Sequence, residues 1–282
     1  MTANGYKLDI MVPTHGHVEK TIKCIERIYQ CTPTPFHLIV VDDSTDLTPL
    51  YIASLKQSND NITFCHSDEP YKSGNQFFNI AISKMKTPYL ATVMNSVTVE
   101  PEWEVEGLKL MESNSEIGIV CFKCLFPDTG RIESAGIRMV KWLPTDIGRD
   151  LPAQRLSTNY EVEACQWAFA LLRKEAVDGQ LDEDLMYGFK GVDDVDNCFV
   201  IKDKGWKIWY CGHGSGYHDP KATRVDDSLE GKNENAYNME LFYKRWGYWE
   251  DFQKEMLGLD LKYMLHTGPI KSGAGEVPPV VE

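Results

Sequence analysis

The sequence contains no long apolar run and no block of basic residues, and each absence excludes a class of function. No hydrophobic stretch reaches the roughly 18 consecutive apolar residues that a membrane-spanning helix needs. The formal net charge is −13, whereas tight binding to nucleic acid depends on basic side chains that neutralise phosphates. We therefore expect no transmembrane segment and no nucleic-acid partner.

Two further signals are missing. The first residues, MTANGYKLD, include no apolar segment of the kind found in a signal peptide, so we expect a cytoplasmic protein. Of the 8 cysteines, only Cys121 and Cys124 have CxxC spacing, and no second pair follows at the spacing of a zinc site. We interpret both as buried free thiols, because the run around them, IGIVCFKCLF, is typical of a strand.

Residues 1–125 alternate between strand and helix patterns. Predicted strands are Lys7–Val12, Phe36–Val41, Ile62–Cys65, Tyr89–Met94 and Ile117–Phe122. Predicted helices are Val18–Ile28, Leu47–Gln57, Gln76–Met85 and Glu102–Met111. This alternation with short links predicts an α/β fold, with a mainly parallel central sheet flanked by helices.

The second half of the sequence is less regular. The predicted elements are a turn or hairpin at Pro127–Gly136, a loop at Trp142–Asn159, strands at Glu161–Arg173 and Trp206–Tyr210, and helices at Asp194–Lys204 and Met239–Met256. We expect a single domain over residues 1–262, because no composition shift or linker divides it. The Pro, Gly and Val residues near the end have no period, so residues 263–282 are predicted to form a flexible tail.

Polar residues follow the predicted strands at the point where such sheets bind ligands, beyond the strands' carboxyl ends. Pro13-Thr14-His15 ends the first strand, and Asp42-Asp43 ends the second. Thr14 and the two carboxylates could hydrogen-bond a base or a ribose, and the ring of His15 could stack on a base. The alternative is an ordinary strand-to-helix turn, in which the aspartates cap the next helix.

Three other groups could carry chemistry. Lys72 precedes the helix that contains Asn79, and the N–H groups at a helix start favour an anion. Asp193 and Asp194 open a predicted helix, and a carboxylate beside another carboxylate is a stronger base. His218 follows a Gly-rich segment and could bind a metal or a phosphate. The plainer alternatives are a surface lysine, a solvated helix cap and a structural histidine.

In their order, these motifs resemble the family 2 glycosyltransferases, which have a GT-A fold, from about residue 7 to about residue 220. The matching stretches are DIMVPTHGHVEKTIKCIERI, LIVVDDSTDLT, SGNQFFNIAISKMKTPYLATVMNS, GRIESAGI, and WAFALLRKEA followed by LDEDLMYGFKGVDDVDNCFVIKDKGWKIWYCGHGSGYHD. GRIESAGI is similar to a hairpin of rhamnosyltransferase-like members. The resemblance implies a nucleotide-binding half over about residues 1–125 and an acceptor half over about residues 126–262.

The resemblance further implies an inverting enzyme. It would move a sugar from a nucleotide-diphosphate sugar to a hydroxyl of a glycan or other acceptor. Asp194 matches the family's general base, and Asp193 would orient it or bind the acceptor. Trp167 would stack on an acceptor sugar, and His218 would complete a metal site or contact the diphosphate. The residues implied to bind the nucleotide are Pro13, Thr14, His15, Asp42, Asp43, Lys72, Asn79 and Asn95.

The sequence departs from the family at Asn95-Ser96-Val97. Relatives commonly have Asn-x-Asp or Asp-x-Asp here, and the last Asp holds Mg²⁺ or Mn²⁺ against the diphosphate. Val97 offers no oxygen ligand to such a cation, although Asn95 still offers a carbonyl oxygen. We therefore expect weak or no metal dependence. Lys72, His213, His218 or a helix N-terminus would then balance the phosphate charge without a metal, or a cation would bind weakly through Asn95, His218 and the diphosphate. The alternative is a catalytically inactive nucleotide-sugar or glycan-binding module of the same fold.

Overall fold

The computed structural model describes residues 5–179, 181–183, 192–219 and 229–257, so the tail predicted over residues 263–282 lies outside the described residues. The strands are β1 (Leu8–Thr14), β2 (Phe36–Asp42), β3 (Ile62–His66), β4 (Tyr89–Val93), β5 (Val97–Val99), β6 (Ile117–Leu125), β7 (Ile132–Ser134), β8 (Ile137–Val140), β9 (Leu143–Asp146), β10 (Tyr160–Val162), β11 (Phe169–Arg173) and β12 (Lys207–His218). The helices are α1 (Val18–Cys31), α2 (Thr48–Ser58), α3 (Gly74–Ser83), α4 (Val105–Ser113), α5 (Asp193–Asp203), α6 (Leu229–Arg245) and α7 (Trp249–Leu257).

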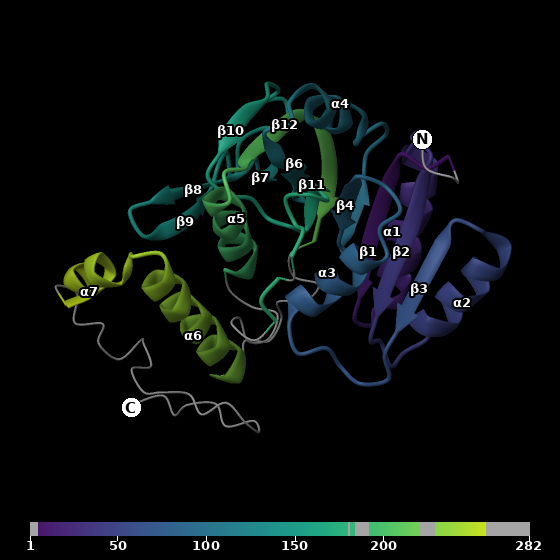
Figure 1. The fold of residues 1–282 in the computed structure, drawn as a ribbon, viewed down its shortest axis with the longest axis horizontal. Coiled ribbons are helices and arrows are strands. Elements are labelled where there is room, and N and C mark those ends of the chain that lie inside the picture. The colour runs from purple at the N-terminus through teal and green to yellow at the C-terminus, as the bar shows by residue number, and fades with distance from the viewer. Residues whose placement is uncertain (1–4, 180, 184–191, 220–228, 258–282) are drawn as a thin grey trace.

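The main sheet is mixed, with the strand order β10-β12-β6-β11-β4-β1-β2-β3 (Figure 1). In addition, β5 pairs with β12 and β7 pairs with β6. β1 pairs in parallel with β2 and β4, and β2 pairs in parallel with β3. β11 runs antiparallel to both β4 and β6. The predicted α/β class is therefore confirmed, but the predicted parallel arrangement describes the first half better than the second.

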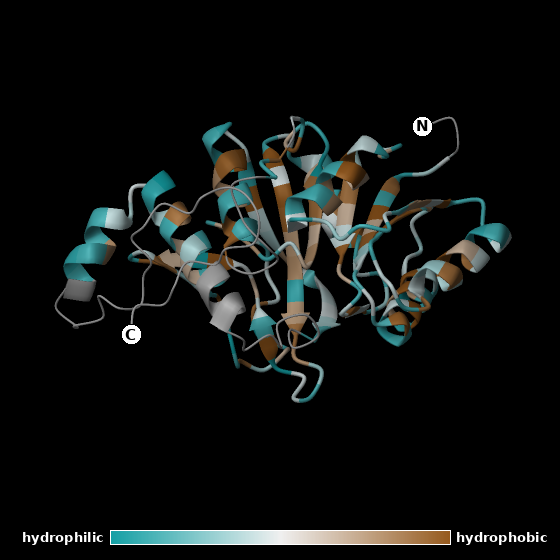
Figure 2. Ribbon diagram, turned by 90° about the horizontal axis from the view of Figure 1, so that it is seen from below, coloured by the Kyte–Doolittle hydropathy of each residue, from teal (hydrophilic) through white to brown (hydrophobic). Residues whose placement is uncertain are grey.

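Helices cover both faces of this sheet. Side chains of α3, α5 and α6 pack on one face, among them Phe78, Val195 and Phe242. Side chains of α1, α2 and α4 pack on the other, among them Ile25 and Met111. Every residue of β2 and β6 is buried, which explains their continuous apolar runs. Figure 2 shows these hydrophobic strands between helices with hydrophilic outer surfaces.

In the second half of the chain, the first difference from the predicted elements is at the Gly-rich segment before His218. The strand predicted at Trp206–Tyr210 is longer, because β12 continues through the Gly-rich segment to His218. A Cβ atom on Gly214 would lie 2.3 Å from the carbonyl oxygen of Trp103, and one on Gly212 would lie 2.5 Å from a backbone carbon of the preceding loop. These glycines therefore allow close approach of two backbones, at a point where the pairing of β12 with β6 shifts register.

Three other predicted elements are also corrected. The strand predicted at Glu161–Arg173 is two strands, β10 and β11, separated by residues 163–168. The loop predicted at Trp142–Asn159 contains β9, which pairs with β8. The helix predicted at Met239–Met256 is divided into α6 and α7, and between them Gly247 has a φ of 78°. A left-handed glycine is a common helix terminator because it has no Cβ atom to clash.

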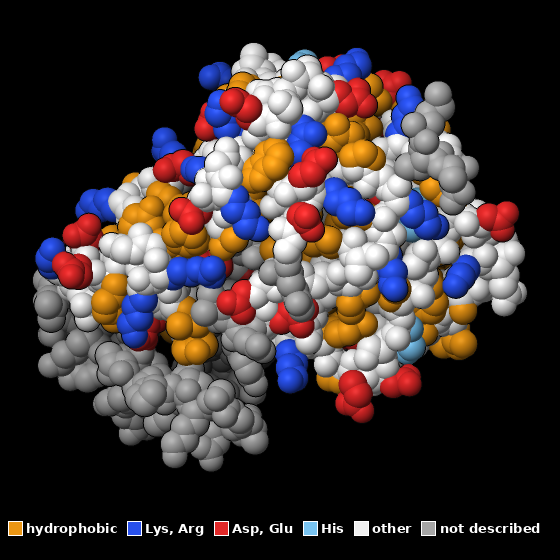
Figure 3. Space-filling view, in the orientation of Figure 1, with side chains coloured by type: hydrophobic (Ala, Val, Ile, Leu, Met, Phe, Trp, Pro, Cys, Tyr) orange, Lys and Arg blue, Asp and Glu red, His pale blue; other side chains and the backbone are white. Residues whose placement is uncertain are grey.

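The surface carries charges of both signs, and the cysteines of the CxxC pair lie in the interior. On the face drawn in Figure 3, basic and acidic side chains are interspersed. No described helix is both long enough and apolar enough to cross a membrane. Cys121 and Cys124 are buried free thiols, as predicted. They pack on opposite faces of the sheet, because side chains three residues apart on a strand point in opposite directions.

Candidate active site

Asp42 joins the carboxyl ends of three neighbouring strands. Its carboxylate accepts a hydrogen bond of 2.6 Å from the hydroxyl of Thr14 at the end of β1. It lies 2.6 Å from Nδ1 of His66 at the end of β3, and it also accepts a hydrogen bond from the Ser44 hydroxyl. Asp42 itself is fully buried, whereas the His66 side chain is 27% exposed. Asp42 therefore organises this edge, and His66 is the member of the network with surface available to a ligand.

Asp43 has a similar organising position. Its Oδ1 lies 2.7 Å from Nδ1 of His15, and its Oδ2 accepts a hydrogen bond of 2.8 Å from the backbone N–H of Tyr71. The side chain of His15 is 60% exposed, which fits the predicted stacking on a base. Pro13 is buried within β1, so its contribution is to the strand rather than to the surface of the site.

The turn between β4 and β5 places Asn95 close to the start of α1. The Asn95 side-chain amide donates hydrogen bonds to the carbonyl oxygen of Gly16 at 3.3 Å and to the hydroxyl of Thr21 at 3.1 Å. The turn is closed by a hydrogen bond of 2.8 Å from the N–H of Val97 to the carbonyl of Met94. Asn95 is thus at the predicted edge of the sheet, where it braces the loop after β1.

The side chain of Val97 belongs to the apolar core. It is 1% exposed and packs with the core cluster on the α1 side of the sheet. Val97 pairs with His218 across β5 and β12. Val97 therefore lies beside His218 with an apolar side chain that packs into the core and offers no oxygen ligand to a cation. Ser96, one residue earlier, is only partly buried.

The start of α3 faces the same edge. Of the two residues predicted to bind the nucleotide here, one is exposed and the other is hydrogen-bonded within the protein. Lys72 is exposed, which fits a predicted contact with phosphate. The Asn79 amide donates hydrogen bonds to the carbonyl of Leu181 at 2.9 Å and to the Glu183 carboxylate at 2.7 Å. Asn79 therefore holds residues 181–183 against α3, and its predicted place beside the base or diphosphate stays a prediction.

The carboxylate of Asp194 lies at the start of α5, next to the end of β4. Its Oδ2 accepts a hydrogen bond of 3.1 Å from the backbone N–H of Trp167. The N–H of Met94 donates to the carbonyl of Ala168 at 2.9 Å, so the same segment also contacts the β4–β5 turn. Asp193 Oδ2 would lie 3.2 Å from a Cβ atom added to Gly74, the first residue of α3. The structure thus brings the predicted acidic pair to the predicted nucleotide edge.

Trp167 is placed differently from its prediction. Its side chain is fully buried and packs edge-to-face on Phe78, with 5.0 Å between ring centroids. The indole N–H points to the sulfur of Cys198, at 3.4 Å. No ring face is exposed for a sugar, so this burial does not fit the predicted stacking. Trp167 contributes its backbone N–H to Asp194 instead.

His218 ends β12 beside the β4–β5 turn. Its Nδ1 lies 2.7 Å from the Glu133 carboxylate, and the next residue, Asp219, donates its N–H to the carbonyl of Ser96 at 3.0 Å. Among the described residues, no group of three or more His, Cys, Asp or Glu side chains could hold a metal ion. A cation at His218 would therefore need oxygen ligands from the diphosphate or from water.

Sequence reasoning missed several residues of this edge. His66 follows the strand predicted at Ile62–Cys65, and its position at a carboxyl end was the available signal. Glu133 lies in the matched stretch GRIESAGI, but that resemblance gave it no role. Asp146, whose carboxylate accepts a hydrogen bond of 3.1 Å from the side chain of Gln166, had no signal of either kind. Burial raises the pKa of Asp146 above its ordinary value, which indicates a sheltered acid beside the Trp167 segment.

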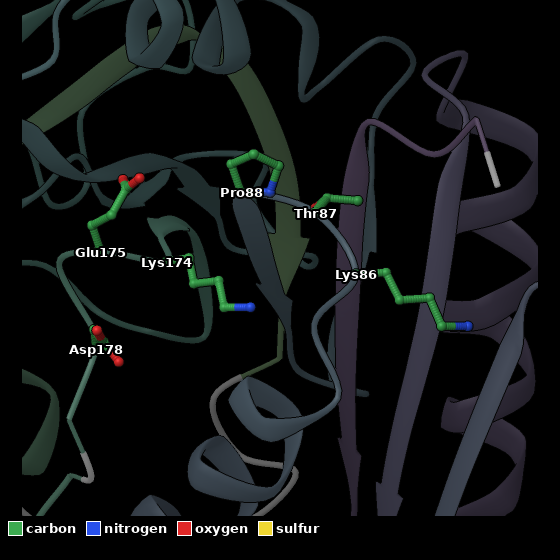
Figure 4. Close-up of a pocket in the computed structure, with 6 residues that line it drawn as sticks. All are labelled: Lys86, Thr87, Pro88, Lys174, Glu175 and Asp178. Carbon is green, nitrogen blue, oxygen red and sulfur yellow. The ribbon is translucent and has the colours of Figure 1, made fainter. Parts of the chain in front are cut away.

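A cavity of about 380 Å³ lies elsewhere in the molecule (Figure 4). Its walls come from the segments before β4 and after β11: Lys86, Thr87, Pro88, Lys174, Glu175 and Asp178. Since β11 runs antiparallel to β4, both segments are at the end of the sheet opposite to the carboxyl ends of β1–β4. The cavity contains none of the predicted site residues and mixes basic with acidic side chains.

Comparison with solved structures supports the fold. GalNAc-T7, in a structure titled as containing UDP, GalNAc and Mn²⁺, is 14% identical with a TM-score of 0.64, over 83% of this chain and 48% of that one. Residues 1–349 of TarS from S. aureus are 13% identical, with a TM-score of 0.55, over 84% and 72% of the two chains. The mannosyltransferase PcManGT from Pyrobaculum calidifontis, in complex with GDP-Man and Mn²⁺, is 14% identical, with a TM-score of 0.59, over 87% and 66%.

These structural similarities confirm the predicted GT-A fold. The chain spans about half the length of GalNAc-T7. No curated protein matches the chain. A model of the family described as glycosyl transferase family 2 matches residues 9–179. Because this match covers more than half of the sequence, the chain belongs to glycosyl transferase family 2.

Proposed function

We propose that the protein is an inverting glycosyltransferase. It moves a sugar from a nucleotide-diphosphate sugar to a hydroxyl of a glycan or glycoconjugate. Membership of family 2 supports glycosyl transfer. The observation that carries the finer proposal is the position of Asp194, whose carboxylate is oriented by the Trp167 N–H next to the β4–β5 turn.

Asp194 acts in this proposal as the general base. It takes the proton from an acceptor hydroxyl while that oxygen attacks the anomeric carbon, and the nucleoside diphosphate leaves from the opposite face. A base must be ionised before it can take a proton. The start of α5 favours a negative charge through the helix dipole. Asp193, the neighbouring acid, binds the acceptor or orients Asp194.

The donor would lie along the carboxyl ends of β1–β4. His15 and Lys72 are exposed there, and the Asp42 network holds His66 at the end of β3. Two structural relatives are complexes with UDP and with GDP-Man, which supports a nucleotide donor without selecting the base. On the acceptor side, the half-buried Asp146 and Gln166 replace Trp167 as the side chains proposed to contact a sugar.

A divalent cation would neutralise charge on the departing diphosphate when bound. The fit of this chain to such a cation is partial. His218 can supply one imidazole ligand, but no described cluster supplies the remaining ligands. Weak metal dependence stays a prediction, which rests on Val97 in place of an acidic ligand. A cytoplasmic location and a place in polysaccharide biosynthesis also stay predictions.

The alternative of an inactive binding module of the same fold stays a prediction. It is motivated by Val97, which stands where relatives have an acidic ligand. The acidic pair and His218 are both brought to the edge where a donor would bind.

The proposal is tested by donor hydrolysis with a panel of nucleotide sugars. The wild-type protein is expected to hydrolyse at least one donor slowly in the absence of an acceptor. Asp194→Asn, which cannot take up the proton, is expected to lose about 10²-fold or more of this activity. Calorimetric binding of the nucleoside diphosphate is the control and should be unchanged. Nucleotide binding without turnover of any donor or acceptor by the wild type would contradict the proposal.

A further inference from the structure

Trp167 contacts the helix of the proposed base at two points that lie one turn apart. Its backbone N–H donates a hydrogen bond of 3.1 Å to Oδ2 of Asp194. Its indole N–H donates to Sγ of Cys198, at 3.4 Å. Cys198 follows Asp194 by four residues on α5, and side chains four residues apart lie on the same face of a helix. Trp167 is therefore held against one face of α5 through both its backbone and its side chain.

The thiol of Cys198 also holds the residues that precede Trp167. Its Sγ donates a hydrogen bond to the carbonyl oxygen of Cys165, at 3.7 Å. A thiol has one proton to donate and a sulfur atom that accepts, and both bonds are weak. Cys198 directs the proton to Cys165 and the sulfur lone pairs to the indole of Trp167. All three side chains are fully buried, so solvent does not replace these contacts.

The direction of the Trp167 backbone N–H depends on the position of the indole ring. The carbonyl oxygen of Trp167 accepts a hydrogen bond of 2.6 Å from the Thr92 hydroxyl. That carbonyl belongs to the peptide unit after Trp167, whereas the N–H belongs to the unit before it, so the Thr92 bond does not fix the N–H direction. Without the sulfur of Cys198, the buried indole N–H loses its acceptor and the ring gains space to tilt. A tilted ring would displace the backbone N–H from Asp194.

The surroundings of the thiol pair do not support a redox role. Sγ of Cys165 and Sγ of Cys198 lie 3.9 Å apart. Hydrogen bonds with the thiols of Cys121 and Cys198, together with burial, raise the pKa of the Cys165 thiol well above its ordinary value. Because the thiolate is the reactive form, Cys165 remains an unreactive thiol near neutral pH. The contacts of Cys198 with the Trp167 segment are then the property to be explained.

We propose that Cys198 is a positioning residue, which holds Trp167 so that its backbone N–H is directed at the carboxylate of Asp194. This inference rests on the proposed function, because the carboxylate that it orients is the proposed base. A hydrogen bond from the N–H restricts rotation of the Asp194 side chain, and a base that stays in place takes up the acceptor proton more efficiently.

The hydrogen bond is measured by NMR on the protein without any ligand. Trp167 is the only tryptophan preceded by glutamine, so ¹³C-carbonyl glutamine combined with ¹⁵N-tryptophan selects its backbone N–H signal. Asp194→Asn defines the position of this signal when the charged acceptor is absent. We expect Cys198→Ala to move the signal toward that position, and Cys198→Ser, whose hydroxyl both donates and accepts, to restore most of the wild-type position.

The matched control is Cys211→Ala, which truncates another fully buried thiol on the opposite face of the sheet. It should leave the Trp167 signal unchanged. A wild-type position of the signal in Cys198→Ala, or an equal displacement in Cys211→Ala, would overturn the proposal.

The second measurement is the kcat of donor hydrolysis and the KM for the donor. Cys198→Ala is expected to lower kcat by about 10-fold, because a displaced catalytic group reacts more slowly, and to leave KM unchanged. Cys198→Ser should recover most of the loss. In an Asp194→Asn background, Cys198→Ala should add nothing, and an equal loss in both backgrounds would overturn the proposal. Because the Trp167 signal needs no turnover, a failed hydrolysis test would be distinguishable from a failure here.

Discussion

The substitution Val97→Asp gives different expected results depending on whether position 97 is a metal-ligand position or a core position. If Val97 were a lost metal ligand, Val97→Asp would restore a cation site. The structure instead places this side chain in the core, at 1% exposure. We therefore expect Val97→Asp to destabilise the protein without improving Mn²⁺ binding. Ser96→Asp, one residue away at a partly buried position of the turn, is the matched control.

The magnitude follows from what the core loses and gains. Removing a buried valine side chain costs about 1.5–3 kcal/mol. A buried carboxylate without a strong partner adds several kcal/mol more. The sum, on the order of 5 kcal/mol, is a large part of the roughly 5–15 kcal/mol that stabilises a folded domain. Ser96→Asp buries no isolated charge, so we expect a change of about 1 kcal/mol or less.

Chemical denaturation measures the two stabilities, and titration with Mn²⁺ in the presence of UDP or GDP measures the two affinities. Any gain in Mn²⁺ affinity is expected from Ser96→Asp rather than from Val97→Asp. Since Val97 pairs with His218, a carboxylate at position 97 that did bind a cation would share it with His218. A stable Val97→Asp protein with tighter Mn²⁺ binding would therefore refute our placement of this position.

Two further predictions concern stability. Arg245→Met leaves the buried Asp196 without its ion pair of 2.7 Å. Because Trp246 still donates to Asp196, we expect the free energy of unfolding to fall by about 2 kcal/mol near neutral pH. Asp196→Asn should lower it by less. Burial raises the pKa of Asp196, whereas Arg245 lowers it, so folding disfavours the charged form. The stability deficit of Arg245→Met should therefore shrink as the pH falls through the acid range. Denaturant unfolding at two pH values measures this deficit, and a deficit that grows on acidification would contradict the prediction. Gly214→Ala would bring a Cβ atom within 2.3 Å of the Trp103 carbonyl oxygen, so we expect a loss of about 3 kcal/mol or more in thermal unfolding. Gly130→Ala meets no atom within 4 Å and is strained only by its φ of 65°, so it should lose less, about 1–2 kcal/mol.

The sequence predicted the first half of the fold well because its signals are local. Strands such as β2 are buried along their whole length, and a continuous apolar run marks such a strand directly. The second half depends on contacts between distant residues. Gly214 continues a strand because a distant backbone, at Trp103, approaches it closely, and no local pattern carries that information.

The candidate site shows the same division. The order of motifs placed polar residues at the correct edge, and that edge exists in the structure. Which side chains are open there depends on hydrogen bonds between elements. Asp42 is enclosed by partners from three segments, and Trp167 is enclosed by Phe78 and Cys198. Strand ends can be predicted from periodicity, but the burial of a side chain at a strand end requires the packed structure.

The anomeric configuration of the first-formed product tests the central claim most directly. A nucleotide-sugar donor whose sugar is α-linked is incubated with the protein. The released sugar is followed by ¹H NMR before its two anomers equilibrate in solution. Our account predicts that the β anomer forms first, and that Asp194→Asn releases it at least about 10²-fold more slowly. Release of the α anomer first, or equal rates for Asp194→Asn and the wild type, would contradict an inverting reaction with Asp194 as its base.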